Sequence, residues 1–178
     1  MKKEQLLRYY KTEPVILQNA SKCWDSMLNA LYEVDLLSPL MMLAMISTVR
    51  IEVGRDFLPK KEIITEAQAN ANYQNHKWLG NKLPGDGYRF IGRGWPQLTG
   101  RYNYEDMSKK LGIDLVNNPD LLLDPEVSAK VMVQFAKDKG IKPLAEAQNW
   151  TAVRFKWNGG SNGLSEFQKK ITEFSKPL

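Results

Sequence analysis

The sequence has little of the side-chain chemistry on which disulfide-stabilised and metal-dependent proteins rely. Its 178 residues include a single cysteine, Cys23, and a single histidine, His76. One cysteine cannot form a disulfide within the chain, so we expect a fold that is stable without one and synthesis in a reducing compartment. Zinc ligands come in clusters of cysteine, histidine and carboxylate, and no such spacing is present. We therefore expect neither a metal nor a cofactor.

Long apolar runs are also missing. The N-terminal MKKEQLLRYY has the basic start of a signal peptide, but not the apolar stretch of about 7–15 residues that should follow. The most apolar run, residues 36–51, is too short and too interrupted to cross a bilayer. We expect no signal peptide, no transmembrane segment and no stable membrane insertion.

The charge is basic but dispersed. The net charge is +5 and the isoelectric point is about 9.2, which favours anionic partners. The lysines come only in short pairs, no arginine-rich run is present, and no glycine-rich loop carries the lysine of a phosphate-binding motif. Nucleic acid is therefore not an expected partner, whereas an anionic cell envelope or an acidic polymer is compatible with this charge.

What the sequence does contain is helical periodicity. Ser38 and Pro39 form an N-cap signal before an apolar stretch, residues 40 to 53, which predicts a buried helix. Asp124 followed by proline predicts another helix start, and apolar residues spaced 3-4-3 from residue 164 predict a closing helix. Strand-like alternation is almost absent. We predict one mainly α-helical domain over residues 1–178, monomeric, with a long irregular loop and at most a small hairpin.

The long loop contains the stretch GDGYRFIGRGWPQLTGRYNY, residues 85–104. It combines glycines with amide, hydroxyl and aromatic side chains, which suit an uncharged polyhydroxylated ligand such as a sugar. The alternative is an ordered loop whose polar groups satisfy its own backbone. Long ordered loops in compact domains are usually functional, and the residues alone leave both interpretations open.

Carboxylates near this loop supply candidate acid–base chemistry. Glu52 ends the buried helix between two apolar residues, where burial and the negative end of the helix dipole favour a protonated carboxyl. A solvated glutamate paired with a neighbouring arginine is the alternative. A glycosidase needs a second carboxylate facing the first. Glu62 is the candidate, with Glu66 and Asp56 as the other possibilities.

Several segments together carry a family resemblance. Glu52 is followed in order by FLPKKE, NANYQ, LGN, the loop of residues 85–104, NNPDLLLDPEVSA and VRFKWNGGSNG. This series resembles glycoside hydrolase family 19, in its chitinase and phage-endolysin branch. The resemblance covers about three-quarters of the chain, and residues 1 to about 35, which we expect to be a helical N-terminal segment, carry no signature of the family.

The resemblance implies a lysozyme-like fold and hydrolysis of β-1,4 bonds in polymers containing N-acetylglucosamine, with inversion. It makes Glu52 the general acid, Glu62 the general base and Thr99 the hydroxyl that helps hold the attacking water. It implies substrate binding for five further residues, namely Gln97, Asn103, Asn158, Tyr88 and Arg93. For the last two, support of the second carboxylate is the alternative role.

The sequence also departs from the family pattern. Ile51 stands where the family often has histidine, and Val53 and Gly54 follow the acid in place of a Thr/Ser-Gly-Gly run. Pro96 precedes the glutamine where the family often has isoleucine or leucine.

The expected substrate is bacterial peptidoglycan. We expect an endolysin-like, bacteriolytic enzyme of a bacteriophage or prophage, made in the host cytoplasm and acting on the cell wall. A chitinase, a lytic transglycosylase and a non-catalytic glycan-binding or virion protein are the alternatives.

Overall fold

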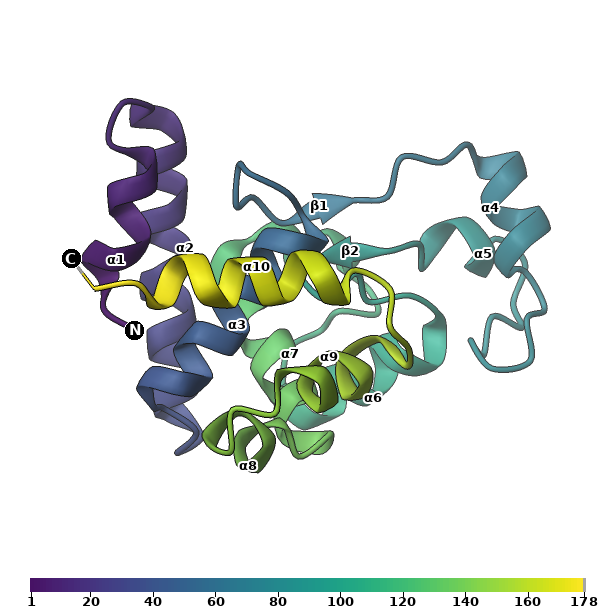
Figure 1. Ribbon diagram of the computed structural model, residues 1–178. Helices are drawn as coiled ribbons and strands as arrows, with labels where there is room; N and C mark the ends of the chain where they lie inside the picture. The colour runs from purple at the N-terminus through teal and green to yellow at the C-terminus, as the bar shows by residue number, and fades with distance from the viewer. Residues whose placement is uncertain (178) are drawn as a thin grey trace. The chain divides into compact units, whose positions relative to one another are not determined.

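A computed structural model describes residues 1–177, which fold into two compact units. Unit 1 comprises Met1–Phe57 and Met132–Leu178, and unit 2 comprises Leu58–Val131. Helices dominate, and the strands within the described residues form one two-stranded antiparallel ribbon (Figure 1). The predicted fold class, mainly α with at most a small hairpin, is confirmed. The single domain stays a prediction.

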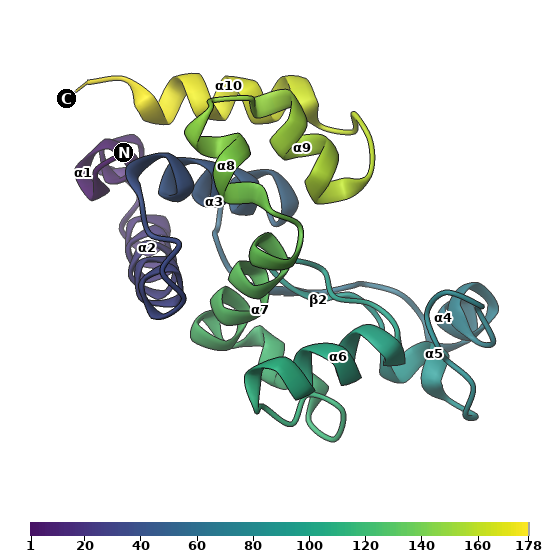
Figure 2. The same cartoon turned by 90° about the horizontal axis from the view of Figure 1, so that it is seen from below.

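Unit 1 is built around the buried helix α3. Its helices are α1 (Lys3–Leu7), η1 (Arg8–Tyr10), α2 (Pro14–Glu33), α3 (Pro39–Glu52), α8 (Ile141–Glu146), α9 (Trp150–Asn158), α10 (Leu164–Ser175) and the second half of α7 (Pro125–Asp138). Helices α2, α8 and α10 all pack on α3, and Figures 1 and 2 show α10 crossing it. The position of Glu52 at the end of α3 is therefore fixed from several sides.

The sequence predicts α3 well because its signals are local. The Ser38 hydroxyl accepts a hydrogen bond from the Met41 backbone N–H at 3.0 Å, and Pro39 occupies the first turn. The helix ends at Glu52, and Gly54 follows with a φ of +88° that favours glycine. Cys23 of α2 is a buried core residue, as the sequence indicates, and burial raises the pKa of its thiol.

Unit 2 contains the ribbon and several short helices. Its elements are β1 (Lys60–Lys61), α4 (Glu66–Tyr73), α5 (Asp86–Arg89), β2 (Arg93–Gly94), α6 (Arg101–Leu111), η2 (Pro119–Leu123) and the first half of α7. In the ribbon, Lys60 pairs with Gly94 and Lys61 with Arg93. Helices α4 and α5 pack side by side, as Figure 2 shows.

The long loop predicted from the sequence is interrupted by two short helices, α4 and α5, which the prediction did not include. The α4 sequence, EAQANANY, has no apolar periodicity, so the pattern did not predict a helix. Its N-terminus is instead defined by a capping box, in which Thr65 and Gln68 bond each other's backbone N–H groups.

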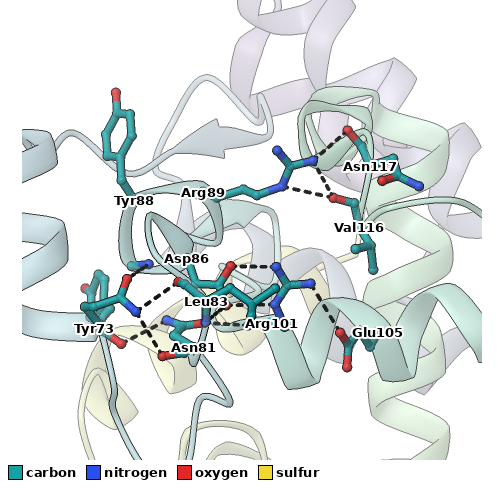
Figure 3. A network of polar contacts seen from close by, with 12 residues as sticks. Tyr73, Asn81, Leu83, Asp86, Tyr88, Arg89, Arg101, Glu105, Val116 and Asn117 are labelled. Atoms are coloured by element: carbon teal, nitrogen blue, oxygen red, sulfur yellow. Dashed lines mark hydrogen bonds and ion pairs between the residues drawn. The ribbon is translucent and has the colours of Figure 1, made fainter.

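A buried polar network fixes the long loop (Figure 3). The Asp86 carboxylate, 1% exposed, accepts hydrogen bonds from Arg101 Nε at 2.8 Å and Nη2 at 2.6 Å, and from the Leu83 N–H at 2.9 Å. Burial opposes ionisation, but the Arg101 guanidinium and the backbone donors lower the pKa of Asp86 below its usual range. Asn81 accepts from the Arg101 N–H and donates to the Tyr73 carbonyl. The network therefore ties the end of α4 to the start of α6.

None of the helices within residues 1–177 combines the length and the apolar character that crossing a membrane requires.

Candidate active site

The Glu62 carboxylate, just after β1, is held from two directions. Oε1 accepts a hydrogen bond from the Tyr73 hydroxyl at 2.7 Å, and Oε2 accepts one from the Gly92 N–H at 3.1 Å. The Glu62 N–H in turn donates to the Gly92 carbonyl at 2.8 Å. The side chain is half-buried. Glu62 is therefore oriented while keeping access to solvent, as a general base requires.

Tyr73, from α4, is a functional candidate that the sequence interpretation did not single out. Its hydrogen bond to Glu62, followed by burial and by the charge of that carboxylate, raises the pKa of Tyr73 to about 12. The hydroxyl therefore stays protonated at neutral pH and acts as a donor. The segment NANYQ carries the resemblance, but no local signal indicates that its tyrosine reaches a residue on the ribbon.

Three side-chain oxygens converge on Gly92. A Cβ placed on this glycine would lie 2.8 Å from Gln97 Oε1 and 3.4 Å from both Glu62 Oε2 and Thr99 Oγ1. The carboxylate of Glu62 and the hydroxyl of Thr99 thus border the same small space beside a glycine. A carboxylate and a hydroxyl in this arrangement can hold and polarise one water molecule.

The side-chain amides of Gln97 and Asn103 bind backbone carbonyls around this site and hold it in place. Gln97 Nε2 donates to the Lys60 carbonyl at 3.0 Å and to the Gly94 carbonyl at 2.8 Å, so its amide bridges the ribbon. Asn103 Nδ2 donates to the Thr99 carbonyl at 2.7 Å, and the Thr99 hydroxyl donates to the Gln97 carbonyl at 3.0 Å. Gln97 and Asn103 thus lie beside Glu62 and Thr99.

Arg93 is buried, with 5% of its surface exposed. Its guanidinium donates to Asp120 at 2.6 Å, to the carbonyls of Arg89 and Ile91, and to the Tyr104 hydroxyl. None of these contacts reaches Glu62, so both roles that the sequence left open for Arg93 stay predictions.

Tyr88 is 37% exposed on α5, and its ring points away from the network drawn in Figure 3. Its backbone N–H donates to Asn70 of α4 at 3.1 Å. Tyr88 is therefore available for contact with a ligand.

In unit 1, Glu52 has a cationic partner. Arg154 of α9, 4% exposed, donates from Nη1 to Glu52 Oε1 at 2.6 Å and from Nε to the Asn162 carbonyl at 2.8 Å. The sequence led us to expect apolar neighbours or a nearby arginine such as Arg50 or Arg55. The observed partner lies 102 residues along the chain, although its position one helical turn before the Asn-Gly-Gly sequence was a usable signal.

Asn158 ends α9 and closes the same loop. Its Nδ2 donates to the Asn162 carbonyl at 2.8 Å, and its Oδ1 accepts from the Gly160 N–H at 3.2 Å. Gly163 packs closely on Arg154, since an added Cβ would lie 3.0 Å from Nη2. The Asn-Gly-Gly loop therefore positions the arginine that binds Glu52. Glu52 and Asn158 lie in unit 1, and the other predicted site residues lie in unit 2.

The other carboxylates have different surroundings. Glu66 is exposed at the start of α4, and Asp56 lies in unit 1. Neither is among the atoms that surround Gly92. Within unit 2, the geometry therefore favours Glu62 over Glu66 as a catalytic candidate.

The fold matches chitinases of known structure. A chitinase C variant superposes with a TM-score of 0.69 at 19% identity, covering 98% of this chain and 74% of its own. Chitinase C from Streptomyces griseus superposes with a TM-score of 0.59 at 24% identity, covering 86% and 66%. The fold is thus that of the lysozyme-like, mainly helical chitinases.

Sequence comparison defines the family. Residues 61–159 match the Chitinase class I family, so the chain belongs to glycoside hydrolase family 19, a family of glycosidases. A Haemophilus influenzae protein with a family 19 domain is 36% identical over 107 residues, which cover 60% of this chain and 52% of that protein. Endochitinase 1 of Theobroma cacao is 46% identical over 55 residues, covering 30% and 17%. This chain therefore matches only about half, or less, of these relatives.

Proposed function

We propose that the protein hydrolyses β-1,4 glycosidic bonds of bacterial peptidoglycan by an inverting acid–base mechanism. The observation that carries the proposal is the convergence of Glu62 Oε2 and Thr99 Oγ1 on the space beside Gly92. It lies within the segment that matches the family, and it provides the base and the hydroxyl that water activation needs.

In this mechanism a single displacement breaks the bond. Glu52 protonates the glycosidic oxygen, and Glu62 takes a proton from the water that attacks the anomeric carbon from the other face of the sugar. Thr99 orients that water, and Tyr73 holds Glu62. Arg154 orients Glu52 before the reaction. No step requires a metal or a cofactor.

The basic charge supports peptidoglycan as the substrate. The chain carries a net charge of +5, and the peptide stems of peptidoglycan bear carboxylates, whereas chitin is uncharged. Positive charge increases the rate of encounter with an anionic polymer, an effect that salt weakens. We extend the proposal to an endolysin-like enzyme that acts as a monomer on the cell wall.

Chitin is the second candidate substrate, and the names of the plant relatives favour it, because several are endochitinases. The test is incubation with purified peptidoglycan and with chitin oligomers, followed by mass analysis of the products. The proposal predicts reducing-end muropeptides and little release from chitin. Anhydro ends would indicate a transglycosylase, faster release from chitin would indicate a chitinase, and binding without release would indicate a glycan-binding protein.

Two variants test the assigned carboxylates. Glu52→Gln should abolish turnover while preserving the fold and sugar binding, and a fully active variant would exclude Glu52 as the acid. Glu62→Gly should lose turnover and recover it with azide, giving an inverted glycosyl azide. Unaffected turnover in Glu62→Gly would move the base to another residue.

A further inference from the structure

Unit 2 contains a groove that the proposed chemistry does not use. It encloses about 530 Å³ between α5 and the segment around η2, a volume typical of ligand sites. Its lining includes Tyr88, Arg89, Asn118 and Leu121. We call it the Arg89 groove. Tyr88 and Leu121 are 37% and 40% exposed, so apolar surface is open to a ligand there.

The Arg89 groove lies on the face of the ribbon opposite Glu62. Lys61 and Arg93 are direct cross-strand partners, and both contact the Asp120 carboxylate, at 3.4 Å and 2.6 Å. Arg93 and Asp120 line the groove. Successive side chains along a strand point to opposite faces, so Glu62, which follows Lys61, is directed away from it. The groove is therefore separate from the water-holding site at Gly92.

Arg89 is held in position and still has a free donor group. Its Nε donates to the Val116 carbonyl at 3.3 Å, and its Nη2 donates to the carbonyls of Val116 at 3.0 Å and Asn117 at 3.2 Å (Figure 3). Within residues 1–177, Nη1 makes no hydrogen bond. Because the guanidinium is planar and docked along one edge, its Nη1 donors have a fixed direction, which lowers the entropy cost of binding an anion.

The charge of the groove is positive. Its lining holds Arg89 and Arg93 against the single carboxylate of Asp120. Burial opposes ionisation of Asp120, but Arg93 and Lys61 lower its pKa, so it is ionised and already paired with cations. Asp120 therefore pairs with Arg93 rather than with Arg89. Arg89 also helps to lower the pKa of Asp114, after the hydrogen bonds from Asn117, but Asp114 does not line the groove.

We propose that the Arg89 groove binds a carboxylate of the peptide stems that branch from peptidoglycan. The Arg89 Nη1 and the exposed Asn118 amide donate to the carboxylate, and Tyr88 and Leu121 contact the small apolar side chains of the stem. This inference rests on the proposed function for its ligand, and it explains how a glycosidase of this fold would distinguish a peptide-bearing glycan from chitin.

The experiment measures binding of the tetrapeptide L-alanyl-γ-D-glutamyl-L-lysyl-D-alanine by NMR titration of the full chain. The peptide should shift the Arg89 Nε–H and Asn118 signals. Amidation of both its carboxyl groups should weaken binding about tenfold or more, as should Arg89→Gln. Lys109→Gln removes the same charge from an exposed position of α6 outside the groove and should leave the affinity unchanged.

Equal affinity of the wild-type protein for the free and the amidated peptide would overturn the inference. This comparison needs no variant, so the test does not depend on whether Arg89→Gln folds. The binding assay needs no bond cleavage, which separates the two proposals. Peptide binding without glycan hydrolysis would refute the proposed activity alone. Hydrolysis of peptidoglycan by a protein that does not bind the peptide would refute the groove alone.

Discussion

At the scale of single residues, the account depends on two carboxylates held in different ways. Glu62 receives neutral donors, the Tyr73 hydroxyl and the Gly92 N–H, at 2.7 Å and 3.1 Å. Glu52 receives a charged donor, Arg154, at 2.6 Å. Neutral donors orient a base without a formal countercharge, whereas the arginine both orients Glu52 and compensates its charge. The neutral donors suit the proposed base, whereas the proposed acid must carry its proton beside a cation, which favours an ionised carboxylate.

The contact between Tyr73 and Glu62 has a measurable pH signature. The pKa of Tyr73 is raised to about 12 by Glu62, so Glu62→Gln should bring it back toward the usual value near 10. The measurement is an ultraviolet titration of tyrosinate in wild type and Glu62→Gln, with Tyr73→Phe of each to isolate Tyr73. Since folding raises this pKa, the contact stabilises fully below about pH 10 and is lost as pH rises through about 12. Identical titrations would show that the contact does not form.

Arg154 should be important for stability as well as for Glu52. Arg154→Leu leaves the Glu52 carboxylate without its Arg154 donor and the Asn162 carbonyl with Asn158 as its remaining donor. The free energy of unfolding should therefore fall by about 1–3 kcal/mol. Arg154→Lys should lose less, because the charge remains. The matched control is Arg55→Leu, whose ion pair with Glu13 is exposed and is worth at most about 1 kcal/mol. Urea unfolding measures all three, and equal losses in Arg154→Leu and Arg55→Leu would contradict this role.

At the scale of elements, the ribbon and the turn after it form the proposed water site. Gly92 lies between the pairing of β1 with β2 and the side chains of Gln97 and Thr99. Gly92 does not have a positive φ, so backbone strain does not require glycine here. A side chain is excluded because the neighbouring oxygens leave no room for it. The same ribbon has the Arg89 groove on its other face.

Two glycine variants distinguish the effect of a methyl group beside Glu62 from the effect of backbone strain at a positive φ. Gly92→Ala places a methyl group 2.8 Å from Gln97 Oε1, which must shift, and 3.4 Å from Glu62 Oε2 and Thr99 Oγ1. We therefore expect kcat to fall about tenfold or more, with a stability loss of about 1 kcal/mol. Gly112→Ala, in open space at a φ of +66°, should lose about 1 kcal/mol of stability with unchanged turnover of the folded enzyme. Thermal unfolding and kinetics test both, and an active Gly92→Ala would refute the water site.

The elements also show what the sequence can predict. Helices α3, α7 and α10 were predictable because caps and apolar periodicity are local signals, as at Ser38 and Asp124. Helix α4 was not, because its composition is polar and its start depends on a capping box. Glu62 and Thr99 were identified through the family motif. Tyr73 and Arg154 were missed because tertiary contacts, made across 11 and 102 residues, define their roles.

At the scale of the whole molecule, the segment without a family signature has a structural role within unit 1. Arg8 donates to the carbonyls of Lys176, at 3.0 Å, and Pro177, and the Tyr9 hydroxyl donates to the Glu173 carbonyl at 2.6 Å. These donors bind the Glu173 carbonyl in the last turn of α10 and the carbonyls of the two residues that follow the helix. The N-terminal segment thus secures α10, which packs on the helix that ends at Glu52.

Loss of the Arg8 contacts with the C-terminal carbonyls should lower stability without changing the catalytic rate. Arg8→Ala should lower the free energy of unfolding by about 1–2 kcal/mol, whereas Lys11→Ala, at an exposed position, should be within about 0.5 kcal/mol of wild type. Turnover per folded molecule should be unchanged in both. Equal stability of the two variants would show that the Arg8 contacts do not contribute to the stability of the fold.

The central claim is that Glu62 and Thr99 activate a water molecule for direct displacement at the anomeric carbon. The most direct test is proton NMR of the reducing end released in the first minutes of hydrolysis of a β-1,4-linked glycan, before mutarotation. The account predicts that the α-anomer forms first, because a single displacement inverts the configuration. Initial formation of the β-anomer would contradict it.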